Sequence, residues 1–234
     1  LVASSSTTIA LASVLNQYNM NDKGAIEIAP VSWYDQTVSF PETEEEFLKD
    51  LLYPLYGECV RKSLEDAGFS VCTYVIPHGE SSKCLSVYGD ILNFLAAEHL
   101  SRTDCLAALG GGVVGDLCGF CAATYLRGIP YIQIPTTLLA MVDSSVGGKT
   151  AIDLPAGKNL CGAFCQPSLV LCDTDTLDTL PREVFLDGCA EVIKYGILYD
   201  PKLFAHLQEF ALNFDREAVI SRCVELKRDV VAAD

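Results

Sequence analysis

The chain has 234 residues, half of them hydrophobic, which is enough to bury a core in one large domain or two smaller ones and excludes a disordered chain. Its net charge of −15 argues against a protein that binds nucleic acid or anionic membranes through its overall charge. No apolar run approaches the ~20 residues that cross a bilayer. We therefore expect a soluble, cytoplasmic protein with no nucleic-acid or membrane partner.

The 11 cysteines are an odd number and are scattered through apolar stretches, which favours buried thiols in a reducing compartment over a disulfide framework. Cys118 and Cys121 form a CxxC pair, and Cys161 and Cys165 a CxxxC pair. A zinc or redox site needs a second ligand pair or a reactive setting. We expect these thiols to serve packing.

The first twenty-odd residues carry weak signals. Short strands are expected at 25–29 and 31–40, on either side of Pro30. The acidic run 42–46 is typical of a helix N-terminus or of a solvated face.

From residue 55 onward, helix and strand patterns alternate. Helices are expected at 55–67, 85–100 and 112–125, and strands at 71–76, 105–109, 131–134 and 168–172, with a loop at 77–83. Such alternation predicts a mostly parallel sheet covered by helices, a Rossmann-like α/β fold.

After Pro181 only helices are expected, at 183–199, at 201–212 and from 216 onward. We therefore predict an α/β domain at 1–181 and the start of an all-α domain at 182–234. The last helical pattern has no stop signal and the chain begins without methionine, so we expect a piece of a longer protein.

Two glycine-bearing runs follow predicted strands. The first, 109–116, contains Gly110, Gly111, Gly112 and Gly115, and glycines before a helix let backbone amides approach a pyrophosphate. Ordinary packing at a strand end explains this run about equally well. The second run, 134–150, places hydroxyls, a carboxylate and a lysine where open α/β sheets bind ligands.

A nucleotide-triphosphate P-loop is excluded for the second run. Gly148-Lys149-Thr150 matches the end of the motif GxxxxGK[ST], but Asp143 stands where the motif needs its first glycine.

Four cations lie in glycine-bearing or apolar surroundings and suit an anionic substrate: Arg127, Lys149, Lys158 and Lys194. Glu191 and Lys194 stand three residues apart in an apolar helix, so they share a face. They predict either a shared site or an ion pair within the helix. A metal at Glu191 would need partners, and the three histidines show no pairing.

In combination, these runs closely resemble the 3-dehydroquinate synthase family of sugar phosphate cyclases. The resemblance extends from residue 56 to 234 and includes the segments 79–83, 110–128, 135–150, 157–160 and 190–196 in order. It implies an NAD-dependent, phosphate-eliminating lyase of the shikimate pathway, which converts the seven-carbon sugar acid phosphate DAHP to 3-dehydroquinate in aromatic amino acid biosynthesis.

Matched by motif, Asp143, Lys149, Asn159 and Lys194 resemble substrate-site residues, and Arg127 resembles a phosphate contact that reaches a neighbouring subunit of a homodimer. The resemblance implies NAD contacts at Glu80, Lys83, Gly112, Val113, Asp116, Thr136, Thr137 and Lys158, and at the loop that contains Thr176 and Thr179. Glu191 matches the carboxylate ligand of a catalytic zinc or cobalt ion. The family's histidine ligands are expected beyond Asp234, so we expect this piece alone to lack a complete metal site and to be inactive.

Three other functions stay open. A different sugar phosphate cyclase, of the 2-epi-5-epi-valiolone or 2-deoxy-scyllo-inosose synthase type, would use the same cofactor chemistry. An iron-dependent alcohol dehydrogenase would release NADH. A non-catalytic remnant would bind the cofactor without turnover.

Overall fold

The computed structural model describes residues 2–3, 53–210 and 213–233. The strands expected at 25–29 and 31–40 and the helix start at 42–46 lie outside these ranges. Within them, every helix is too short or too polar to span a membrane.

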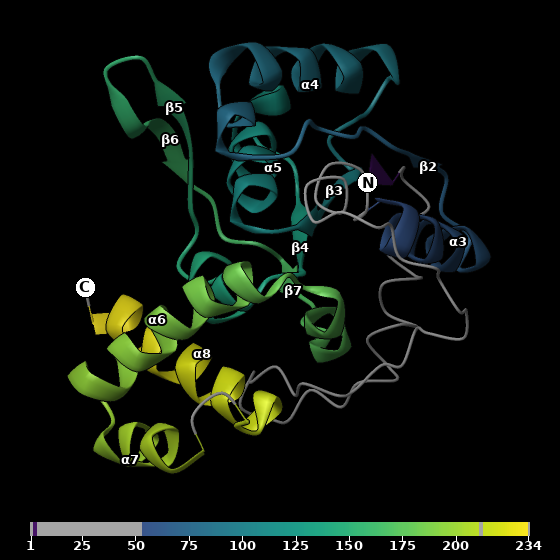
Figure 1. Ribbon diagram of the computed structural model, residues 1–234. Helices are drawn as coiled ribbons and strands as arrows, with labels where there is room; N and C mark the ends of the chain where they lie inside the picture. Colours follow the sequence, from purple (N-terminus) through teal and green to yellow (C-terminus); the bar gives the residue numbers. More distant parts are fainter. Residues whose placement is uncertain (1, 4–52, 211–212, 234) are drawn as a thin grey trace.

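A sheet of five strands lies at the centre, in the order β2-β1-β3-β4-β7 (Figure 1). The strands are β1 (Val2–Ala3), β2 (Val71–Cys72), β3 (Cys105–Gly110), β4 (Tyr131–Pro135) and β7 (Leu169–Val170). β3, β4 and β7 run parallel, whereas β1 is antiparallel to both of its neighbours. The mostly parallel sheet is confirmed, and the carboxyl ends of its parallel strands share one edge.

Two strands are shorter than the sequence predicts. β2 stops at Cys72 instead of Ile76, because only Val71 and Cys72 pair with β1 and Val75 is 62% exposed. β7 keeps two of the five residues expected at 168–172.

Helices cover the sheet. α3 (Glu58–Asp66) follows a π-helical turn at Tyr53–Gly57, and α4 (Leu85–Ala97) lies beside α5 (Gly112–Thr124) (Figure 1). α4 ends three residues before the expected Leu100 because His99 adopts a left-handed φ of 58°. The N–H of Leu100 then donates to Leu95 O and that of His99 to Ala96 O, a helix end that glycine usually forms.

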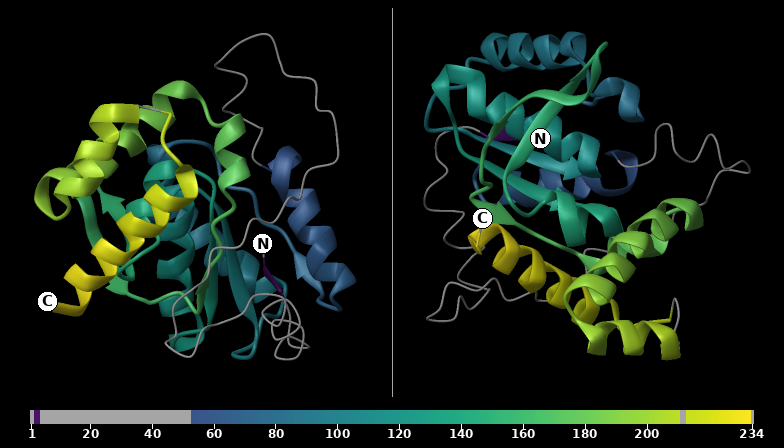
Figure 2. Two further views of the ribbon diagram at one scale, coloured as in Figure 1. Left: turned by 90° about the horizontal axis from the view of Figure 1, so that it is seen from below. Right: turned by 90° about the vertical axis from the view of Figure 1, so that its left-hand side faces the viewer.

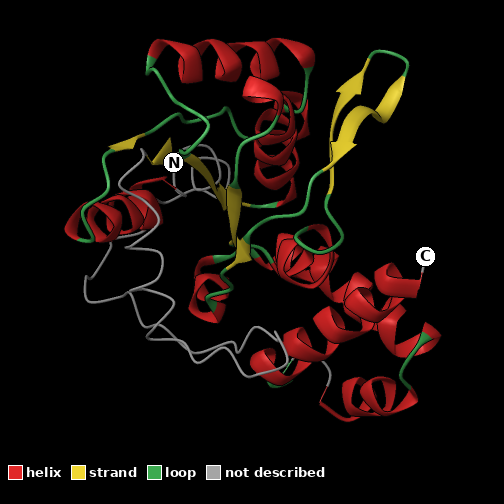
Figure 3. Ribbon diagram, turned by 180° about the vertical axis from the view of Figure 1, so that it is seen from behind, coloured by secondary structure: helices red, strands yellow, loops and turns green. Residues whose placement is uncertain are grey.

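An antiparallel hairpin, β5 (Lys149–Leu154) and β6 (Gly157–Phe164), stands apart from the sheet beside α5 (Figure 3). The sequence did not predict it, because glycines and exposed residues mask the apolar alternation of β6. Ile152 is fully buried and packs with Leu117 and Phe120 of α5, which fixes the base of the hairpin.

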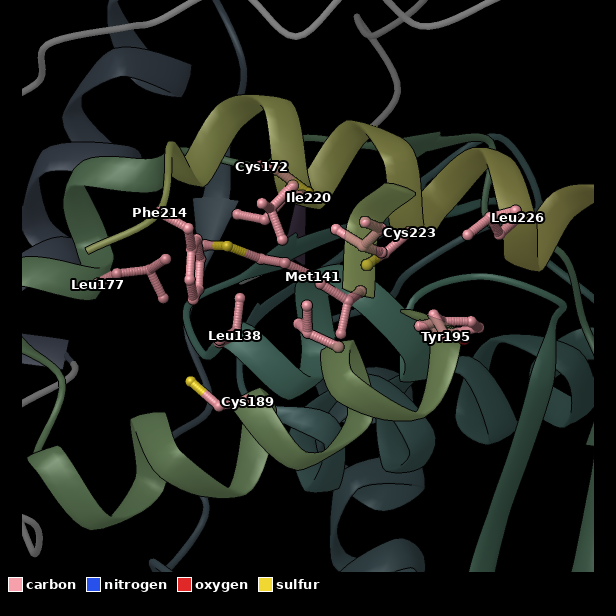
Figure 4. Packing of buried hydrophobic residues seen from close by; sticks show 14 residues of the cluster. Leu138, Met141, Cys172, Leu177, Cys189, Tyr195, Phe214, Ile220, Cys223 and Leu226 are labelled. Atoms are coloured by element: carbon pink, nitrogen blue, oxygen red, sulfur yellow. The ribbon is translucent and has the colours of Figure 1, made fainter. Parts of the chain in front are cut away.

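The predicted helices of the last part are confirmed as α6 (Arg182–Leu198), α7 (Pro201–Phe210) and α8 (Arg216–Ala233), which form one group beside the sheet (Figure 2). Their core also contains residues that precede position 181, including Leu138 and Met141 beside Cys189, Ile220 and Cys223 (Figure 4). The domain boundary near 181 stays a prediction.

The cysteines are buried or partly buried, and no disulfide joins them. Burial raises the pKa of the Cys105 thiol to about 11 and that of Cys172 to about 12. These thiols serve packing, which agrees with the sequence.

Asp200 connects α7 to α8. Its carboxylate accepts the N–H groups of Lys202 (3.0 Å) and Leu203 (3.2 Å) and the Nε–H of Arg222 (2.6 Å). We expect Asp200→Ala to lower the free energy of unfolding by about 1–2 kcal/mol, because it removes a helix cap and an ion pair. Asp200→Asn keeps the cap and should lose less, as urea unfolding will show.

The pH dependence of this effect has a definite sign. Arg222 and the α7 amides lower the pKa of Asp200 below its usual 3.8. The stabilisation is therefore complete above pH 3.8 and is lost as the pH falls through the lower, folded-state pKa. The stability difference between wild type and Asp200→Asn should shrink below about pH 4; a constant difference down to acid pH would contradict the ion pair.

Candidate functional site

The loops at the carboxyl edge of the sheet approach one another closely. The N–H of Thr136 donates to Gly110 O at 3.1 Å. A methyl group on Gly111 would lie 3.2 Å from Thr137 Cγ2, and one on Gly112 would lie 3.1 Å from Ser144 Oγ. A side chain at either position would therefore have to push Thr137 or Ser144 back by a few tenths of an ångström, and the predicted Gly112, Thr136 and Thr137 lie together.

At this edge, the hydroxyl groups of Thr136 and Ser144 have no hydrogen-bond partner among the described residues. Thr136 is 1% exposed, and neither its Oγ1 nor the Oγ of Ser144 hydrogen bonds to any described residue. Buried polar atoms without a partner are rare in folded proteins. With the N-terminal amides of α5, which begin at Gly112 and Val113, they form a site suited to an anionic or hydroxyl-bearing ligand.

The predicted threonines of the next loop are held inside the protein. They belong to a 3₁₀ turn, Thr174–Thr179, that follows β7. Thr176 is buried, the hydroxyl of Thr179 donates to Thr176 O at 3.1 Å, and Tyr56 Oη hydrogen bonds with Thr179 Oγ1. The turn thus follows the third parallel strand at the same edge of the sheet.

Lys83 joins two other predicted residues, Asp116 and Asn159. It is 5% exposed, and its Nζ lies 2.5 Å from Asp116 Oδ2 and donates to Asn159 Oδ1 at 2.5 Å. Burial raises the pKa of Asp116, and Lys83 opposes that shift. Nearby, Lys158 and Glu80 form a solvent-exposed ion pair at 3.1 Å.

A cavity of about 490 Å³ opens between the hairpin, α8 and the π-helical turn Ala140–Ser144. The polar residues that line it are Asp116, Asp143, Ser144, Lys149, Thr150, Asn159 and Lys227. The predicted Asp143, Lys149, Asn159 and Asp116 thus line a single cavity, although they come from four separate segments.

Asp143 is the most connected carboxylate of the cavity. It accepts hydrogen bonds from Tyr195 Oη at 3.0 Å and from Lys227 Nζ at 2.5 Å. Burial favours the neutral carboxyl, but Lys227, Tyr195 and Lys194 together hold the pKa of Asp143 below its usual value. Asp143 is therefore a carboxylate at neutral pH.

Sequence reasoning missed Lys227. It occupies an ordinary position in the helical pattern of α8, with no neighbouring motif. Only the packing of α8 against the turn Ala140–Ser144 brings it to Asp143, so no local signal could have found it.

Glu191 and Lys194 form the intrahelical ion pair that was one of the two expectations. Lys194 remains half exposed and lies 5.3 Å from the ring centroid of Tyr195, the residue that hydrogen bonds to Asp143. The pair therefore stands beside the cavity. No three His, Cys, Asp or Glu side chains in the described ranges are grouped as metal ligands.

Arg127 lies away from the cavity. It is exposed, with a left-handed φ of 69°, in the turn Tyr125–Arg127 that follows α5. α5 begins at the carboxyl edge of the sheet, so its far end is at the opposite edge. This chain does not bring Arg127 to the other site residues, and its contact with a neighbouring subunit stays a prediction.

Cys84 differs from the packing thiols. It precedes α4, next to Lys83, and its Sγ lies 3.1 Å from Ser86 Oγ. Hydrogen bonds from Ser86 and the Val87 amide lower the pKa of its thiol, whereas burial raises the pKa of Cys72. Because the thiolate is the reactive species, we expect iodoacetamide to modify Cys84 faster than Cys72.

Mass spectrometry of partly alkylated peptides will measure both rates. Cys84→Ser is the control and should remove the faster reaction alone. Equal rates at the two cysteines would contradict the expected thiolate.

Comparison with known proteins shows which protein families this chain resembles. A family model described as 3-dehydroquinate synthase N-terminal matches residues 73–187. The 3-dehydroquinate synthase of Symbiobacterium thermophilum is 50% identical over 187 residues, 77% of this chain and 52% of that protein. That of Pelobacter propionicus is 52% identical over 186 residues, 77% of this chain and 52% of that protein. The chain spans about half the length of the curated relatives it matches.

Solved structures support the same relation. 2-Epi-5-epi-valiolone synthase from Streptomyces hygroscopicus subsp. jinggangensis 5008, with NAD⁺ and Zn²⁺ bound, is 30% identical with a TM-score of 0.73. The match covers 78% of this chain and 53% of that chain. 2-Deoxy-scyllo-inosose synthase, complexed with carbaglucose-6-phosphate, NAD⁺ and Co²⁺, is 32% identical with a TM-score of 0.61. The match covers 66% of this chain and 45% of that chain.

An iron-containing alcohol dehydrogenase shares the fold alone, at 14% identity and a TM-score of 0.59. The match covers 78% of this chain and 58% of that chain. Identity of 50–52% across 77% of the sequence is a much closer relation than a shared fold, and the chain belongs to the 3-dehydroquinate synthase family.

Proposed function

We propose that the protein is a 3-dehydroquinate synthase, a phosphate-eliminating lyase that converts DAHP to 3-dehydroquinate in the shikimate pathway. The observation that carries this proposal is the single cavity lined by Asp143, Lys149, Asn159 and Lys227. A fold by itself does not determine a reaction. The relatives at 50–52% identity support this reaction over that of the other cyclases, which are 30–32% identical.

The carboxyl edge of the sheet suits NAD⁺. Gly111 and Gly112 leave the backbone accessible, the Thr136 hydroxyl has no partner in the described part of the chain, and the α5 amides suit a pyrophosphate. We assign the cofactor contacts to Glu80, Lys83, Gly112, Val113, Asp116, Thr136, Thr137, Lys158, Thr176 and Thr179. When bound, NAD⁺ supplies the reversible oxidation of one substrate hydroxyl.

The cavity suits a substrate with a phosphate and a carboxylate. Lys149 and Lys227 bring two cations to its wall, and Lys194 stands beside it. Such cations offset substrate charge and hold the substrate in position. Asp143, kept ionised by Lys227 and Tyr195, orients the ammonium group of Lys227 toward the substrate.

The described residues fit a metal only in part. Glu191, with a side chain 16% exposed, would supply one oxygen ligand to a divalent ion, and Lys194 would then have to release it. No further ligands are grouped with it in the described ranges. We propose zinc or cobalt for the complete enzyme, with Glu191 as one ligand and the others supplied from outside these ranges.

Two assignments concern the assembled enzyme. We place it in the cytoplasm, because its many free cysteines favour a reducing compartment. We also propose a homodimer in which Arg127 contacts the substrate phosphate of the neighbouring subunit, because within its own chain Arg127 is exposed and lies far from the cavity.

The test measures cofactor binding and turnover separately. The chain is titrated with NAD⁺ by calorimetry, and the complete enzyme is incubated with DAHP, NAD⁺ and Zn²⁺ while phosphate and 3-dehydroquinate are measured. Equimolar formation of both products, without net NADH, supports the proposal. NAD⁺ binding without phosphate release favours a non-catalytic remnant.

Alternative substrates separate the related reactions. Turnover of sedoheptulose 7-phosphate or glucose 6-phosphate in preference to DAHP would assign the protein to another cyclase. Net accumulation of NADH from an alcohol would favour a dehydrogenase, the class of the 14% identical structure.

A further inference from the structure

Asp153 lies on the hairpin between the cavity and the Lys83 segment. The pairing of β5 with β6 is regular as far as Ile152 opposite Cys161 and resumes at Leu154 opposite Gly157. One residue of β5, Asp153, therefore faces three residues of β6, 158–160. The irregularity removes the regular ladder partner of the middle residue, Asn159.

Asp153 replaces that missing partner. Its Oδ1 accepts the backbone N–H of Asn159 at 2.8 Å. Asn159 adopts a φ of 57°, a left-handed conformation that asparagine tolerates only at some cost. A hydrogen bond to a carboxylate is stronger than one to a neutral acceptor, so Asp153 stabilises this conformation.

Two more hydrogen bonds close a ring. The backbone N–H of Asp153 donates to Lys83 O at 2.8 Å, and Lys83 Nζ donates to Asn159 Oδ1 at 2.5 Å. Lys83 is 5% exposed and also pairs with Asp116. Because Lys83 takes the amide oxygen of Asn159, the side-chain NH₂ group remains as the donor that Asn159 offers to the cavity it lines.

We propose that Asp153 is a positioning residue: by accepting the Asn159 N–H it fixes the bulge that presents the Asn159 side chain to the substrate. Asp153 itself touches no substrate. The proposal rests on the proposed function for its substrate and assigns Asp153 a role that acts through Asn159 alone.

The first measurement needs no activity. Hydrogen exchange of the Asn159 backbone amide is followed by NMR in wild type, Asp153→Ala and Asp153→Asn. Loss of a charge-assisted hydrogen bond should accelerate exchange by about 10- to 100-fold in Asp153→Ala. Asp153→Asn keeps an acceptor oxygen and should restore most of the protection. Unchanged exchange in Asp153→Ala would overturn the proposal.

The second measurement is a double-mutant cycle on DAHP turnover with Asp153→Ala and Asn159→Ala. Asp153→Ala alone should lower kcat/KM by about 100-fold, the effect of a displaced contact. In the Asn159→Ala background, Asp153→Ala should cause no further loss of kcat/KM, whereas a merely structural role of Asp153 would lower kcat/KM further. An additional loss there would overturn the proposal. The turnover cycle uses the complete enzyme; if its wild type does not turn over DAHP, the proposed function fails, and the exchange measurement alone decides the role of Asp153.

Discussion

Gly188→Ala should lower the free energy of unfolding by about 3 kcal/mol, the upper end of the usual cost of overpacking. An added methyl group would lie 2.6 Å from Leu138 Cβ and 2.7 Å from Leu139 N. The Leu139 nitrogen belongs to the backbone, so it cannot move away by changing a rotamer. α6 must therefore shift away from the segment that leads into Asp143.

A matched variant is Gly89→Ala, in the middle of α4, where an added methyl group meets nothing within 4 Å. It should raise the free energy of unfolding by about 0.5–1 kcal/mol, because alanine favours the helix. Urea denaturation followed by circular dichroism measures both variants. If Gly188→Ala is as stable as Gly89→Ala, the close contact between α6 and Leu138 is wrong.

Lys227→Met should lower kcat/KM for DAHP by about 100-fold or more, provided the protein is the synthase that we propose. The substitution keeps most of the unbranched side chain, which becomes one atom shorter, and removes the cation that donates to Asp143 at 2.5 Å. The partly buried Asp143 carboxylate then loses its ion-pair partner and keeps the hydrogen bond from Tyr195, so the free energy of unfolding should also fall, by about 2 kcal/mol. Lys202→Met, on the exposed surface of α7, is the control and should be neutral in both measurements.

The pH dependence gives a second readout. Lys227 contributes to the lowered pKa of Asp143, so its removal raises that pKa. Any stabilisation that depends on ionised Asp143 is complete above the pKa of the unfolded carboxyl and is lost as the pH falls through the folded value. The acid limb of the pH–rate profile should therefore shift to higher pH in Lys227→Met. An unshifted limb with normal turnover would contradict the assigned role of the pair.

The outcome at individual residues shows where sequence reasoning stops. Gly68 ends α3 as the glycine rule predicts, but α4 ends at a left-handed His99, for which no residue type gives a signal. The hairpin of β5 and β6 was missed although its apolar residues pack on α5, because glycines, exposed residues and the irregularity at Asp153 interrupt the alternation. Periodicity detects a buried face most readily when the strand has no glycines or bulges.

For this protein, the order of strands and helices after residue 55, apart from the hairpin of β5 and β6, and the motifs at Gly112, Asp143, Lys149 and Glu191 follow from the sequence, because hydrophobic spacing and glycine are local properties. The pairing of Asp143 with Lys227, the link from Lys83 to Asn159 through the hairpin, and the exposed place of Arg127 were decided by tertiary structure. Lys227 follows Asp143 by 84 residues, and Asn159 follows Lys83 by 76. Contacts over such separations depend on how helices and strands pack against one another, and side-chain spacing along the chain carries no record of that packing.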